Sequence, residues 1–223
     1  DYDYQDFELH GSLKNYFFTG EAGLADKNLN FVFSGDLDYT EDIALYKFNF
    51  NLKHADLNAL NLTERPLKAR GQIDVDVATA NFRSINGTLD VRDVAIFNGK
   101  TLYAVDSLLF ASIDQTGNSK ISIRSDIMTG DFEGTINLFD MGNALRRHFN
   151  NYYSLRDTTF NRPAEIQKFS FALVLKNTDL LTEILVPKLD PFVPGKIEGK
   201  FDSENDELDL SIDLTKIRYG DVG

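Results

Sequence analysis

One strand-forming pattern occurs twice in this sequence, at residues 47–57 and again at 168–180. The copies read Lys47-Phe48-Asn49-Phe50-Asn51-Leu52 and Lys168-Phe169-Ser170-Phe171-Ala172-Leu173. Each continues into an Asp-Leu pair and later into another alternating segment that opens near a glycine. Alternation of apolar and polar residues with a period of two predicts half-buried β-strands. The chain is therefore built by repeating a sheet unit with one apolar and one hydrated face.

The same alternation covers most of the remaining sequence and predicts about ten strands of the antiparallel type. Turn signals such as Asn98-Gly99, Thr116-Gly117-Asn118 and Glu204-Asn205-Asp206 separate them. The segment Tyr103–Ile113 carries apolar residues in both registers, which predicts a strand covered on both faces.

Helical spacing interrupts the strands in two places. Apolar residues recur at Leu138, Met141, Leu145, Phe149 and Tyr152, which predicts a helix near 140–152 with Asp140 as its N-cap. A shorter helix is predicted over 178–185, ended by three prolines. We expect both helices to cap the sheet.

The predicted fold is all-β: an elongated, curled antiparallel sheet with an apolar lining and one or two short capping helices. We divide it into a first segment (1–153), a connecting loop (154–164) and a second repeat unit (165–223) that continues the sheet.

Composition limits the classes of function. The chain has 223 residues and a 42% hydrophobic share, enough for a folded core, and its formal charge of −12 disfavours nucleic acid as a partner. It lacks cysteine, a long apolar window and a signal-peptide pattern at Asp1-Tyr2-Asp3-Tyr4, so we expect a soluble piece without disulfides.

Residue patterns for catalysis or metal binding are missing. The three histidines are far apart in sequence, and the pairs Asp36/Asp38 and Asp74/Asp76 alternate along strands, which predicts a solvated face rather than a site. We interpret 202–207 as an acidic hairpin turn, and Arg146-Arg147-His148 as the polar side of a helix. Nucleotide and nucleophile fingerprints are also missing. The sequence predicts neither an enzyme nor a cofactor.

The apolar face must be covered, because exposing it to water costs about 25 cal/mol per Å². In a sandwich, a second sheet fills the space and the face is only core; in a curled, open sheet, the face can hold acyl chains. Alternation is consistent with both. The side chains in the lining register are Phe48, Phe50, Leu52, Leu89, Val91, Ile121, Ile123, Phe132, Ile136, Phe169, Phe171, Leu173, Ile197, Phe201, Leu208, Leu210, Ile212 and Leu214.

A family resemblance bears on this choice. The stretch from Phe48 to Leu62, with 67–74 and 81–91 after it, resembles the TamB branch of the AsmA-like proteins, as found in Bacteroidetes. Residues 103–108, 125–134 and the helix end Asn151-Tyr152-Tyr153 are similar to segments that follow in those proteins. The resemblance spans about Phe48 to Tyr219.

The resemblance implies a periplasmic β-taco, a U-shaped sheet with an apolar lining, within a longer protein anchored in the inner membrane. Such a protein is linked to outer-membrane biogenesis and would carry phospholipid acyl chains along the lining. Contact with an outer-membrane barrel protein would use parts of the full-length chain that are absent here. The alternative is a scaffold or chaperone-like module for outer-membrane protein assembly, which binds a client by strand addition at a free sheet edge.

Overall fold

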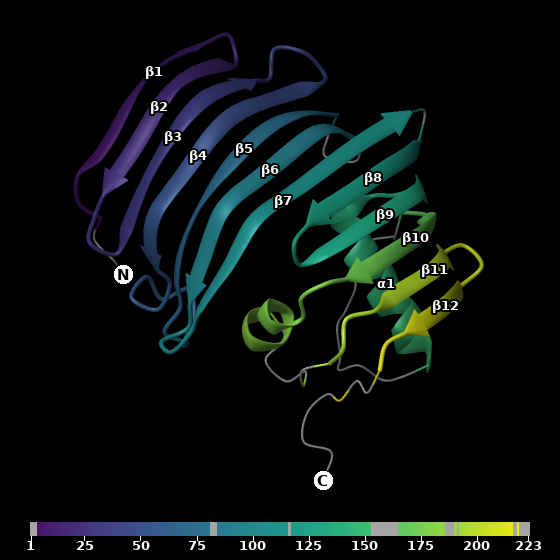
Figure 1. Ribbon diagram of the computed structural model, residues 1–223. Coiled ribbons are helices and arrows are strands. Elements are labelled where there is room, and N and C mark those ends of the chain that lie inside the picture. The colour runs from purple at the N-terminus through teal and green to yellow at the C-terminus, as the bar shows by residue number, and fades with distance from the viewer. Residues whose placement is uncertain are drawn as a thin grey trace.

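The computed structural model describes residues 4–80, 84–115, 117–152, 165–185, 190, 192–215 and 218. Twelve strands form one antiparallel sheet, and each pairs with its neighbours in sequence order (Figure 1). Their bounds are β1 Phe7–Lys14, β2 Phe17–Ala25, β3 Leu29–Asp38, β4 Ala44–Asp56, β5 Lys68–Ala80, β6 Ser84–Phe97, β7 Leu102–Gln115, β8 Asn118–Ser125, β9 Met128–Thr135, β10 Lys168–Leu175, β11 Lys196–Asp202 and β12 Glu207–Asp213. Two helical segments accompany the sheet, α1 (Leu138–Tyr152) and the single turn η1 (Leu181–Leu185).

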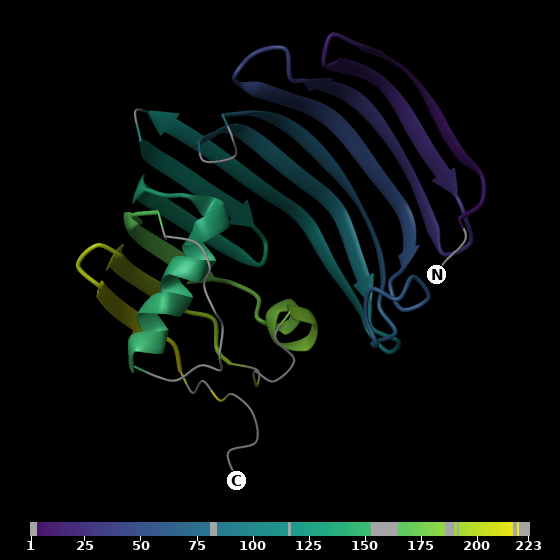
Figure 2. The ribbon, with the colours of Figure 1, turned by 180° about the vertical axis from the view of Figure 1, so that it is seen from behind.

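The sheet is curled and not closed, as Figures 1 and 2 show. Strands β4–β7 have 13 or 14 residues, whereas β8–β12 have seven or eight, so the sheet narrows toward its C-terminal end. The all-β, curled antiparallel fold with short helices that alternation predicted is confirmed.

Cross-strand pairing aligns apolar residues into continuous rows on one face, which we call the inner face. One row crosses the sheet from β4 to β12 through Phe48, Val75, Leu89, Phe110, Ile123, Gly130, Leu173, Ile197 and Ile212. Because side chains alternate between faces, residues two positions along each strand form parallel rows on the same face. Both repeat copies therefore contribute to one surface.

The opposite, outer face carries the charged positions. Lys47 pairs with Asp76 (3.6 Å), Lys120 with Glu133 (3.1 Å) and Arg124 with Asp131 (2.6 Å), each across neighbouring strands. Asp74 contacts Arg92. The prediction that Asp74 and Asp76 lie on a solvated face is confirmed, and such exposed pairs contribute little stability.

Strand β7 differs from the prediction. Val105 is buried, as expected for one register, while Leu109 and Ile113 are exposed, so the strand is not covered on both faces. Asp93 in the neighbouring β6 has a φ of +53°, and beside it the pairing of β5 with β6 shifts register between Arg70 and Gln72. Such a bulge changes which side chains face inward. The two apolar registers therefore belong to two halves of one strand.

Strands β1 and β2 were not predicted, although Phe7, Leu9 and Leu13 in β1 alternate with polar residues. Glycines weaken the signal: Gly11 and Gly20 lie opposite each other and leave gaps in the apolar pattern. The signal in β1 could have been recognised.

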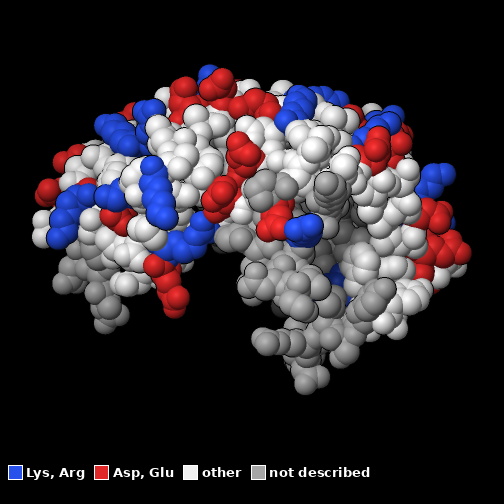
Figure 3. All heavy atoms as spheres, turned by 60° about the horizontal axis from the view of Figure 1, so that its bottom comes forward, with Lys and Arg blue, Asp and Glu red and all other residues white. Residues whose placement is uncertain are grey.

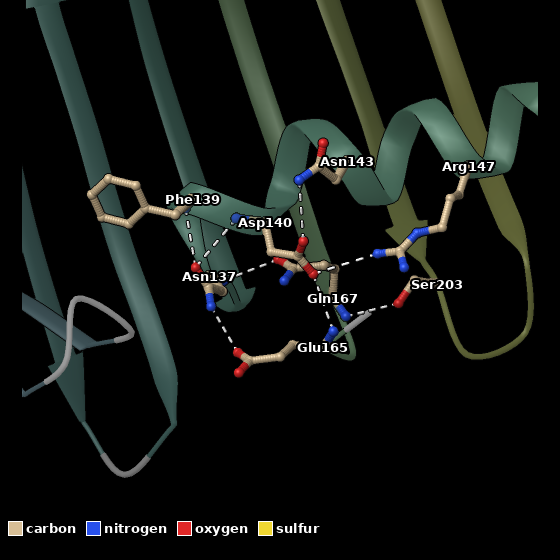
Figure 4. A network of polar contacts seen from close by, with 8 residues as sticks. All are labelled: Asn137, Phe139, Asp140, Asn143, Arg147, Glu165, Gln167 and Ser203. Atoms are coloured by element: carbon tan, nitrogen blue, oxygen red, sulfur yellow. Dashed lines mark hydrogen bonds and ion pairs between the residues drawn. The ribbon is translucent and has the colours of Figure 1, made fainter. Parts of the chain in front are cut away.

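Helix α1 begins two residues before the predicted start. Its N-cap is Asn137 rather than Asp140, because the Asn137 Oδ1 accepts hydrogen bonds from the backbone N–H groups of Phe139 (3.0 Å) and Asp140 (3.3 Å) (Figure 4). The helix face also differs: Ala144 and His148 are buried, whereas Phe149 and Tyr152 are exposed. The interpretation of His148 as part of a polar helix side was therefore wrong.

Two apolar clusters hold the helices against the sheet. In the α1 core, Ala144, Met141 and Leu145 pack with Phe169 and Phe201 of the sheet. Figure 2 shows α1 lying across β8–β12. The η1 core is a separate cluster, made up of Leu57, Leu67, Val94, Ile96, Tyr103, Val105, Ile127, Leu180 and Ile184.

The η1 core brings the two repeat copies together, because Leu57 and Leu180 are the leucines of the repeated Asp-Leu pairs. Arg65 reinforces this contact by donating to the carbonyl oxygens of Glu183 (2.5 Å) and Ile184 (2.9 Å). Strand β10 adds directly to β9, so the second unit continues the sheet of the first. The predicted connecting loop 154–164 lies outside the described residues.

Candidate functional site

The inner face contains every predicted lining residue that lies in a strand. Other rows run parallel to the one through Phe48. On one side of it, one row contains Phe50 and Val91, and the next contains Leu52. On the other side, one row contains Ile121, Phe132, Phe171 and Leu210, and the next contains Phe169, Phe201 and Leu208. Ile136 and Leu214 lie just beyond β9 and β12. The structure thus brings the predicted residues onto one surface whose covering changes along its length.

Over β1–β7, most of the inner face has no covering element within the described part of the chain. Phe48, Phe50, Leu52, Leu89 and Val91 are all half-buried, and none belongs to the α1 or the η1 core. On β1 the inner side chains are more open still, with Leu13 75% exposed. Figure 3 shows the molecule from below, with a hollow under the arch of the curled sheet.

Aromatic rings line this open region. Phe31 and Phe50 have ring centroids 5.2 Å apart, and Phe33 and Phe48 are 5.3 Å apart. These contacts between neighbouring strands shield part of each ring, which explains how the side chains remain half-buried without a second layer. Phe31 and Phe33 were recognised as strand residues but not as lining residues, although their alternation carried that signal.

Over β8–β12, α1 covers one side of the inner face. Phe201 is 1% exposed, and Ile121, Ile136 and Phe169 are also buried in the α1 core. These four residues were predicted to line an open groove. In this structure they are packed core, because side chains of α1 occupy the space above them.

A narrow lane remains between the two helices. Ile123, Leu173 and Ile197 are half-buried, Ile212 is exposed, and none belongs to either core. The lane continues the row of Phe48 and Leu89 through Phe110, which lies at the border of the α1 core. Gly130 lies in this row and allows Leu173 to lie across it, since an added Cβ would meet Leu173 Cδ2 at 2.6 Å.

Tyr46 lies on the inner face, two residues before Phe48 on β4. Burial raises the pKa of Tyr46 to about 12, and a hydrogen bond with Tyr39 adds to the shift. The Tyr46 hydroxyl therefore stays neutral at the edge of the aromatic region. An uncharged apolar surface of this kind favours hydrocarbon over a charged ligand.

Charged groups instead connect β10 to β11 and stabilise the turn between β11 and β12. Lys168 lies 2.7 Å from Asp202 and lowers the pKa of that carboxyl to about 2. Asp202 also accepts from the backbone N–H groups of Glu204 and Asn205, which forms the predicted acidic hairpin turn between β11 and β12. These residues are structural.

Comparison with known proteins gives no match, whether with family models, curated proteins or solved structures. Among the described residues, the helices are too short or too polar to cross a membrane.

Proposed function

We propose that the inner face binds the acyl chains of phospholipids, in a TamB-like periplasmic bridge protein that carries lipid between the inner and outer membranes. The observation that carries the proposal is the unbroken apolar row from Phe48 to Ile212. The resemblance of 48–219 to TamB supports the cellular setting.

The proposed mechanism is passive. Acyl chains lie on the inner face while headgroups remain in water at the open side, and each buried methylene contributes about 0.8 kcal/mol. Strand spacing of about 4.8 Å makes the row from β4 to β12 roughly 38 Å long. This exceeds the roughly 15 Å hydrocarbon depth of one membrane leaflet, so a whole chain fits along it.

Side-chain photo-crosslinking tests the proposal. A photoreactive amino acid at Phe50 faces the open region, and one at Phe171 lies in the row next to the lane, packed against the α1 core. The matched control is Asn51, the next residue on β4, which points to the outer face. With phospholipid present, the proposal predicts labelled lipid from Phe50, less from Phe171 because α1 packs against it, and none from Asn51.

Equal lipid labelling from Phe50 and Asn51 would contradict the proposal, because the two positions differ only in the face that they present. Labelling of protein without lipid at Phe50 would point instead to a protein client. Performing the experiment in cells and with purified protein separates these two outcomes.

A second candidate function is strand addition to a client protein, as in a scaffold for outer-membrane protein assembly. It is favoured by the two sheet edges at β1 and β12, each of which pairs with a single neighbour among the described residues. All eight residues of β1 are exposed. Such edges offer unpaired backbone groups to an added strand.

Different substitutions should impair lipid binding and strand addition. A proline at Leu9 on β1 removes a backbone donor that faces the free edge, because the hydrogen-bonded pairs between β1 and β2 alternate from Asp6 with Ala25. It should weaken client binding without reducing lipid labelling from Phe50. Phe50→Asn should do the reverse.

A further inference from the structure

We propose that the sheet surface beneath α1 is a second acyl-chain binding site, and that α1 is a displaceable cover held in place by a latch between His148 and Asp206. This inference rests on the proposed function, since it assigns the same ligand class to a covered part of the inner face.

The covered surface is continuous with the open one. Phe132 pairs with Phe171 and Ile121 in the row adjacent to the lane, and Phe169 pairs with Phe201 in the next row. Removing α1 would therefore widen the lane by two apolar rows. No change in the sheet itself is needed.

Polar contacts near both ends of α1 hold it to the sheet. At the N-terminal end, Asn137 donates to Glu165 (2.7 Å), and Asp140 accepts from the Glu165 backbone N–H (3.1 Å) (Figure 4). Arg147, within α1, donates to the same Asp140 carboxylate at 3.4 Å. Gln167 Oε1 accepts from the Asn137 backbone N–H at 2.9 Å.

At the C-terminal end, His148 Nδ1 lies 2.6 Å from Asp206 Oδ1 in the β11–β12 turn. Asn151 donates to the other oxygen of the same carboxylate at 2.8 Å. His148 is buried and its ring contacts Phe201, with centroids 5.7 Å apart. One turn residue thus joins two side chains of α1 to the sheet, which makes Asp206 the point where the cover can be released.

The helix is poorly suited to permanent docking. One buried atom at this interface, Gln167 Nε2, has no hydrogen-bond partner within the described residues. Gly142 and several asparagines lower its intrinsic helix propensity. A cover that leaves a buried polar group unpaired can be exchanged for a ligand more easily than a fully satisfied core.

Cysteine reporters test the inference, because the chain has no natural cysteine. Leu208→Cys reports the surface under α1, and Phe50→Cys reports the open region. Asp206→Ala should raise the maleimide labelling rate at position 208 at least tenfold and leave position 50 unchanged. Asp209→Ala, an exposed carboxylate on β12, is the matched control and should change neither rate.

A short-chain phosphatidylcholine below its micelle concentration then supplies the ligand. It should slow labelling at position 50 in every variant and at position 208 in the Asp206→Ala background. Circular dichroism checks that the sheet is retained, and the milder Asn151→Ala should raise labelling at 208 in the same direction by a smaller factor.

The outcomes separate the two proposals. Labelling at 208 that is unchanged by Asp206→Ala, or that rises without protection by lipid while position 50 is protected, overturns the cover and leaves the proposed function standing. Absence of protection at position 50 overturns the proposed function itself.

Discussion

The two ends of this sheet present the same kind of apolar face and cover it differently. Over β1–β7 the inner face is largely open and its rings shield one another, whereas over β8–β12 one side of it is buried beneath α1. Phe48-Phe50-Leu52 and Phe169-Phe171-Leu173 are repeat copies in equivalent strand positions, yet only the second copy contributes to a packed core. An alternating strand pattern therefore specifies a face but not what covers it.

The η1 core connects the two regions. Leu57 and Leu180, together with Arg65 and the backbone of η1, tie the loop after β4 to the segment after β10. The open and the covered region are thereby held as parts of one arch, with a lane between α1 and η1.

The largest contrast should come from truncating one phenylalanine in each region. Phe201→Ala should lower the free energy of unfolding by about 3–5 kcal/mol, because it leaves a cavity beneath α1. Phe50→Ala should lower it by less than about 2 kcal/mol, since a half-buried ring loses less burial. Urea titration of both variants provides the measurement. Equal losses would mean that the open region is covered in solution.

The next largest loss of stability should come from weakening the η1 core, which connects the two regions. Arg65→Met keeps the aliphatic stem but removes the donors to Glu183 and Ile184, and should cost about 1–2 kcal/mol. Hydrogen exchange of 179–185 should accelerate. Arg70→Met, on the outer side of β5, should change stability by less than about 0.5 kcal/mol. If exchange stays the same in Arg65→Met, Leu180 and Ile184 hold η1 without the arginine.

A smaller effect should strengthen the cover. Gly142→Ala in α1 places a methyl group in open space and should stabilise the helix by up to about 1 kcal/mol. Thermal unfolding measures this gain. Gly117→Ala is the matched control: it also has open space, but its φ of +83° should make alanine destabilising. A loss of stability in Gly142→Ala would show that the backbone of α1 is strained.

The smallest expected effects concern pH: the stability of the two regions should fall at opposite extremes of pH. The lowered pKa of Asp202, set mainly by Lys168, stabilises β10–β12 above the unfolded value of 3.8, and this contribution is lost as pH falls toward 2. The raised pKa of Tyr46 stabilises β3–β4 below pH 10, and this contribution is lost as pH rises toward 12.

Hydrogen exchange resolved by peptide can compare the two regions at low and high pH. Asp202→Asn should remove the acid sensitivity of β10–β12, and Tyr46→Phe the alkaline sensitivity of β3–β4. A variant that leaves its own region as pH-sensitive as before would contradict the assignment.

Much of the fold could be predicted from alternation, because antiparallel strands with one apolar face obey a period of two. The lining register was readable for the same reason: Phe48, Leu89 and Ile197 fall in one row once strands pair in order. The bulge at Asp93 and the buried His148 could not be predicted, since each depends on a contact with a distant segment.

The sequence by itself determined an antiparallel sheet with one apolar face, since the side-chain period is a local property of each strand. Only the tertiary structure decided which part of that face is filled. Whether Phe201 meets α1 or Phe50 meets open space depends on where helices return across the sheet, and this is set by long-range packing and by single contacts such as that of His148 with Asp206.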